Sequence, residues 1–205
     1  MANAEQVFRA KAPGIMVKLL SDFPITVEDA AAIVGNLGHE SLGFTAMQEF
    51  KPTVPGSKGG WGWAQWTGPR RRAFEAWCKR TGHNPSSDDA NYAWLFLELK
   101  GIEGTEGKAI GKTVAAKGLD AKVEAFEKAF LRAGVKHYPS RNLWAKRALE
   151  AYRASKGGVS ASPAPTTRPD PSPPAYGASD KAPTWAIIAI ILLGLAIAGL
   201  FFIRF

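Results

Sequence analysis

The chain has 205 residues, a formal net charge of +8 and a single cysteine, Cys78. This length accommodates one compact domain with appended segments, so we expect no second enzymatic domain. The positive charge predicts attraction to polyanions, and one cysteine excludes an internal disulfide and a Cys-rich metal site. The first residues have no signal-peptide pattern, so we expect export by another route.

Residues 1–156 form the predicted folded domain, and their hydrophobic spacing is mostly helical. Pro13-Gly14 is expected to precede the first helix, and Thr26 with Asp29 resembles a capping box. Residues 59–67 alone look extended. The expected helices are 15–20, 27–40, 69–80, 88–100, 119–133 and 140–154.

Residues 157–183 are rich in proline, serine and alanine. Such a segment cannot bury enough apolar area to offset its ordering entropy. We therefore predict a solvated linker.

Residues 184–203 are uncharged and almost wholly apolar. A helix of this length spans a hydrocarbon core of about 30 Å, with Trp185 at one interface and Lys181 and Arg204 outside the span. The alternative is a buried core helix, but such helices in small domains usually keep a polar side. We predict a single-pass C-terminal transmembrane helix that contacts the lipid bilayer.

Glu40 stands at the end of an otherwise apolar predicted helix. A carboxyl held against apolar walls stays protonated to higher pH and can act as a general acid. Gly35 and Gly38 leave room for a substrate or a second backbone, and Asn36 lies one turn before Glu40 on the same face. A simple solvated glutamate is the alternative.

The segment 59–70 alternates glycines with Trp61, Trp63 and Trp66. Flat rings beside small residues make a surface for sugar rings, and Gln65 and Thr67 offer hydrogen bonds to hydroxyl or acetamido groups. The alternative is that the tryptophans fill the core of a small hairpin.

Together, Gly-Asn at 35–36, Glu40-Ser41 and Gln-Trp-Thr at 65–67 followed by Arg70 resemble the phage tail-type lysozyme and endolysin domain of the lysozyme-like superfamily. The match is close over 26–78 and looser around Arg141. The resemblance implies a mainly α fold with a short β-hairpin beside the cleft. It also implies Glu40 as the catalytic acid and 65–67 as part of the cleft.

Such a hydrolase often has a second carboxylate, and Glu49 is the best local candidate, although it is equally well a surface residue. Without a second carboxylate, a lytic transglycosylase would use the 6-hydroxyl of the substrate. His39, His83 and His137 lack zinc-like spacing, so we expect no metal and no cofactor.

The function expected is a phage endolysin that cleaves peptidoglycan between N-acetylmuramic acid and N-acetylglucosamine. Bacterial peptidoglycan would be its substrate and a phage holin its partner, with no role for nucleic acid. The membrane helix would hold it at the host inner membrane, where the domain acts on the periplasmic wall. The rivals are a non-catalytic wall-binding virion component and a membrane-permeabilising protein.

Overall fold

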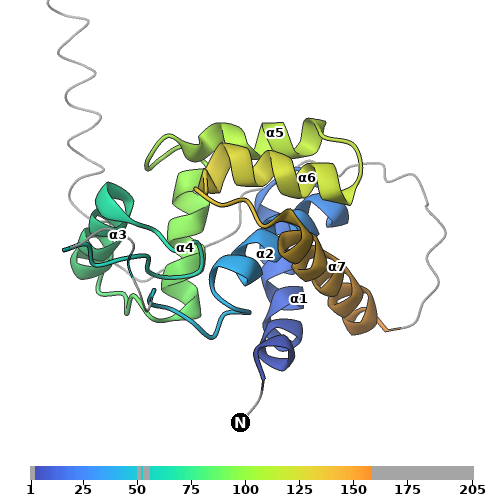
Figure 1. Ribbon diagram of the computed structural model, residues 1–205, viewed down its shortest axis with the longest axis horizontal. Helices are drawn as coiled ribbons and strands as arrows, with labels where there is room; N and C mark the ends of the chain where they lie inside the picture. The colour runs from blue at the N-terminus through green and yellow to red at the C-terminus, as the bar shows by residue number, and fades with distance from the viewer. Residues whose placement is uncertain (1–2, 50–51, 53–55, 158–205) are drawn as a thin grey trace, which may run out of the picture. The chain divides into compact units, whose positions relative to one another are not determined.

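The computed structural model describes residues 3–49, 52 and 56–157, all within one compact unit, Met1–Ser160. This part of the chain is mainly helical, as predicted (Figure 1). The predicted linker, apart from Gly157, and the predicted transmembrane helix lie outside the described residues. None of the helices that the structure describes is long and apolar enough to cross a membrane. The elements are α1 (Ala4–Asp22), α2 (Val27–Glu40), α3 (Gly68–Thr81), α4 (Asp88–Leu99), η1 (Glu106–Lys108), α5 (Ala109–Ala115), α6 (Leu119–Phe126), η2 (Glu127–Leu131) and α7 (Tyr138–Ser155).

Helix α2 is the centre of the fold, packed against α1, α6 and α7 (Figure 1). It begins at the predicted capping box, in which Thr26 and Asp29 bond each other's backbone N–H groups. A Cβ atom at Gly35 would lie 2.4 Å from the Cα of Ala145 in α7. Gly35 is therefore required for the close approach of a second backbone, one of the two roles the sequence allows.

Helix α1 is longer than predicted, because it runs through Pro13 instead of beginning after it. Asn3 and Gln6 form a capping box at its start. The buried Phe8, Ala12 and Met16 recur every four residues along α1. Burial of this face outweighs the backbone hydrogen bond that a proline removes from a helix interior.

The predicted helix over 119–133 is shorter and changes its winding. Regular α6 ends at Phe126, and a π-helical turn, η2, follows to Leu131. Arg132 then takes a left-handed conformation with φ +55° and ends the segment. Helix α5 was not predicted, because its seven residues are too few to show a hydrophobic period.

The predicted β-hairpin is not formed as a pair of strands among the described residues. Gln48 pairs with Trp61, and Trp61 with Trp66, each as an isolated antiparallel bridge. Gly62 and Gln65 have positive φ values of 77° and 48°, which turn the chain too tightly for extended strands to continue. The segment is a tight loop beside α3.

Candidate active site

A pocket of about 430 Å³ lies at the C-terminal end of α2. Three parts of the chain contribute to it: the segment from Glu40 at the end of α2 to Glu49, the loop before α3, and the end of η2 with the loop that follows. Its lining residues are Glu40, Glu49, Ala64, Gln65, Thr67, Leu131, Arg132, Ala133 and Gly134. The structure therefore brings together four of the predicted site residues: Glu40, Glu49, Gln65 and Thr67.

Glu40 is the last residue of α2, and its side chain is 18% exposed. Burial raises the pKa of this carboxyl above the ordinary value of a glutamate, and the nearby charges of Glu127 and Glu49 add to the rise. The guanidinium of Arg141 opposes that shift in pKa, since it stabilises the carboxylate. A shielded carboxyl that opens onto a pocket is suited to donate a proton.

Arg141 holds Glu40 in place from behind. This arginine, in the first turn of α7, is only 1% exposed and donates from Nη2 to Oε1 of Glu40 at 2.6 Å. Its Nη1 donates to Oδ1 of Asn36 at 3.1 Å, and its Nε donates to the carbonyl of Lys136 at 2.6 Å. The sequence placed Asn36 on the face of Glu40, and the structure shows that Arg141 links the two side chains.

Glu49 contributes a second carboxylate to the pocket. Its Oε2 accepts a hydrogen bond from the backbone N–H of Gly60 at 2.8 Å, and its own N–H donates to the carbonyl of Gly60 at 3.0 Å. A Cβ at Gly59 would lie 2.9 Å from Oε2, so a glycine there lets the loop approach the carboxylate. Glu49 is thus fixed by the loop that it faces.

Gln65 and Thr67 reach the pocket from the loop before α3. The amide nitrogen of Gln65 donates to the carbonyls of Ala46 and Gly62 at 3.1 and 3.0 Å. Both of its N–H donors therefore bind backbone, and Gln65 braces the loop against the segment after α2. Thr67 is exposed at the start of α3.

The three tryptophans are not among the described residues that line this pocket. Trp66 is 1% exposed, and its indole N–H donates to Oε2 of Glu98 at 2.7 Å. Trp61 is half-buried and donates to the carbonyl of Pro85 at 3.2 Å. Trp63 is 1% exposed, and it lines a separate cavity of about 280 Å³ between α1 and α4. Their side chains pack the domain next to the pocket.

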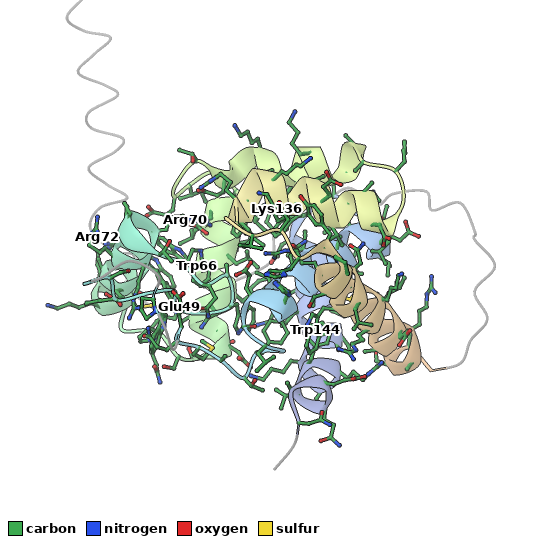
Figure 2. All side chains as sticks on the ribbon, in the orientation of Figure 1. Glu49, Trp66, Arg70, Arg72, Lys136 and Trp144 are labelled. Atoms are coloured by element: carbon green, nitrogen blue, oxygen red, sulfur yellow. The ribbon has the colours of Figure 1, made fainter. Side chains whose placement is uncertain are left out.

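A buried ion pair beneath the loop joins α3 to α4. Arg70 donates from Nε and Nη2 to the two carboxylate oxygens of Glu98 at 2.8 and 2.7 Å. Its Nη1 donates to the carbonyl of Phe130 at 3.0 Å, which fixes the end of η2. Figure 2 shows Glu49, Trp66 and Arg70 on the α3–α4 side of the domain, and Lys136 and Trp144 on the α7 side.

The last residue of η2 and the loop after it, residues 131–134, form the wall that the sequence did not predict. Fully buried Glu127 accepts hydrogen bonds from the backbone N–H of Ala133, from Lys136 and from the Tyr138 hydroxyl. Gly134 marks a turn in the sequence, but nothing in the sequence indicates that this turn lies next to Glu40.

His39 is next to Glu40 on α2 but is not among the described residues that line the pocket. Its Nδ1 lies 2.9 Å from the hydroxyl of Ser140 in α7. Burial, with the positive charges of Arg141 and His137, lowers the pKa of His39 to about 4. His39 is therefore neutral near pH 7, and it ties α2 to α7 by this hydrogen bond.

A mainly helical domain that holds a shielded glutamate and a second carboxylate in one pocket has the groups that glycosidic-bond cleavage requires. The phage tail lysozyme family matches residues 12–152, well over half of the 205, and the chain belongs to this family. Neither the curated proteins nor the solved structures gave a match. Membership supports a peptidoglycan-degrading, lysozyme-like function.

Proposed function

We propose that the protein is a muramidase that cleaves peptidoglycan between N-acetylmuramic acid and N-acetylglucosamine, with Glu40 as proton donor. The observation that carries this proposal is the shielded Glu40 carboxyl, with its raised pKa, in a pocket shared with Glu49. Cleavage of a glycosidic bond needs an acid that protonates the leaving oxygen. Arg141 orients this acid, since it binds Oε1.

Glu49 is the second carboxylate in this proposal. In an inverting enzyme it would activate a water, and in a retaining enzyme it would attack the sugar as a nucleophile. The hydrogen bond from Gly60 to its Oε2 fixes the carboxylate. The presence of Glu49 in the pocket favours hydrolysis, because the transglycosylase reaction needs no second carboxylate. In that reaction the 6-hydroxyl of the substrate closes on the same sugar.

The test is to incubate the full chain with purified peptidoglycan and to identify the released fragments by mass spectrometry. Wild type should release reducing muramic ends, and Glu40→Gln and Glu49→Gln should release almost none. Glu75→Gln, a carboxylate outside the pocket lining, is the matched control and should match wild type. Anhydro-muramic ends, retained by Glu49→Gln, would instead establish a transglycosylase. No fragments from wild type would refute both readings.

We also propose that residues 184–203 anchor the protein in the host inner membrane, with the catalytic domain acting on the periplasmic wall. The support is the uncharged, apolar sequence of this segment. Membrane fractionation tests it: the full chain should sediment with membranes and resist extraction by salt and alkali. A chain ending at Lys156 should be soluble. Full-length protein found in the soluble fraction would contradict the anchor.

A further inference from the structure

Among the described residues that line the pocket, Arg132 is the one with a positively charged side chain. The other ionisable groups in this lining are the carboxyls of Glu40 and Glu49. Its side chain is 46% exposed, so it is accessible to a ligand. The carboxylate of Glu49 would repel an anionic group on a substrate, whereas a guanidinium binds one. The charge of Arg132 should therefore favour substrates that carry an anionic group.

The backbone holds Arg132 in a conformation that disfavours residues with a Cβ atom. Its φ is +55°, in the left-handed region where glycine and asparagine are the usual residues. Its N–H donates to the carbonyl of Glu127 at 2.7 Å, and the next N–H, of Ala133, donates to the Glu127 carboxylate at 2.8 Å. Non-glycine residues in such strained positions cluster at functional sites.

Two nitrogens of the guanidinium contact protein groups. Its Nη2 forms an ion pair with fully buried Glu106, and its Nη1 makes a long contact of 3.4 Å with the carbonyl of Ala129. A guanidinium has five N–H donors, so these two contacts leave donors for a ligand. Glu106 also lies 3.8 Å from Nε of Arg70, so two arginines share this one carboxylate.

We propose that Arg132 is a specificity-determining residue that binds a carboxylate of the peptide stem on the muramoyl sugar. This inference rests on the proposed function, since it names the substrate feature that the same pocket selects. In intact peptidoglycan the lactyl carboxyl of the muramoyl sugar is bound to the stem as an amide, so the sugars carry no charge and the peptide stem supplies the anionic groups. A planar guanidinium fits a carboxylate through two parallel hydrogen bonds.

The experiment compares wild type, Arg132→Asn and Arg132→Lys, because asparagine tolerates the left-handed backbone and should preserve the fold. Lys128→Gln is the control, since Lys128 is an exposed cation of the same η2 segment outside the pocket lining. One arm measures binding of N-acetylmuramoyl dipeptide and its fully amidated form by NMR titration. The other measures cleavage of peptidoglycan and of the same peptidoglycan after its stem carboxyls have been amidated.

Wild type and Lys128→Gln should bind the free acid about tenfold more tightly than the amide, and should cleave native peptidoglycan faster than amidated peptidoglycan. Arg132→Asn should lose both preferences, so that the ratio of its cleavage rates on native and amidated peptidoglycan falls to about one, and Arg132→Lys should keep part of them. An unchanged binding preference in folded Arg132→Asn would overturn the inference. If wild type cleaves neither peptidoglycan but its binding preference depends on Arg132, the proposed function fails and this inference stands.

Discussion

Arg141 donates a hydrogen bond from Nη2 to Oε1 of Glu40 at 2.6 Å, and the arginine is far more deeply buried than the carboxyl it binds. The pair thus has one side closed to water and one side open to the pocket. Removal of the arginine changes both the stability of the domain and the proton affinity of Glu40, and the two effects are separable.

Arg141→Met should move the alkaline limit of activity to higher pH. The cation lowers the pKa of Glu40, so without it the carboxyl keeps its proton, the form needed in a general acid, to higher pH. Rates of peptidoglycan cleavage across the pH range measure the shift. Arg141→Lys keeps a cation and should shift less. A limit that stays in place or moves to lower pH in Arg141→Met would contradict this role.

The same Arg141→Met change should destabilise the domain by about 3 kcal/mol, because it leaves buried groups without their charged partner. Asn36 Oδ1 and the carbonyl of Lys136 both lose a donor. Urea unfolding measures the loss. A purely structural role predicts this destabilisation without any shift in the pH profile.

The free energy of unfolding should fall as pH rises, because ionisation of the Glu40 carboxyl is less favourable in the folded chain than in the unfolded chain. The pKa of Glu40 is raised above 4.5 in the folded state, so above that pH the folded chain binds more protons than the unfolded chain. The free energy of unfolding of wild type should therefore fall relative to Glu40→Gln. The fall should begin near about pH 4.5 and level off above the folded pKa of Glu40. Urea titrations of both proteins from acid to neutral pH test the sign, and a rising difference would refute the raised pKa.

Gly35→Ala should destabilise the domain by about 3 kcal/mol or more, since the new methyl group would overlap the backbone of α7. Gly111→Ala is the matched control. Gly111 lies inside α5 with open space at its Cβ position, and alanine there should stabilise by about 0.5–1 kcal/mol. Thermal unfolding of both variants measures the effects. Equal, small effects would mean that α2 and α7 do not cross as closely as the structure shows.

Glu98→Gln should destabilise by about 3 kcal/mol, because the buried Arg70 pair is broken while Trp66 keeps an acceptor. Asp89→Asn serves as control. Its ion pair with Lys18 is long, 3.5 Å, and exposed, so its loss should cost less than about 0.5 kcal/mol. Unfolding in urea compares the two. A small effect at Glu98 would show that the pair contributes little to the α3–α4 packing.

The parts of the fold that follow from local sequence were predictable. The Thr26–Asp29 cap and Pro69 at the start of α3 are local signals, and they place these helices within a residue or two. Pro13 misled, because its local preference is outweighed by burial of the face of α1. The residues next to Pro13 in the sequence do not indicate that this face of α1 is buried against other helices.

The candidate site was predictable where its residues are close in sequence to a helix end or a glycine-rich loop. Glu40 and Gln65 were found in this way, and both line the pocket. Arg132 and the link from Asn36 to Arg141 were not found, since they join segments about a hundred residues apart along the chain. Charge spacing along a sequence carries no information on such pairings.

The internal hydrogen bonds of Gln65 bear on how relatives of this chain should be sorted. A signature built on Gln-Trp-Thr detects a scaffold, since the glutamine is clamped to carbonyls and the tryptophan is sunk in the core. Under the proposed function, a homologue that lacks the Glu40 carboxyl would keep this scaffold and would still match such a signature. Catalytic and non-catalytic homologues would be better distinguished by the residues at positions 40 and 141.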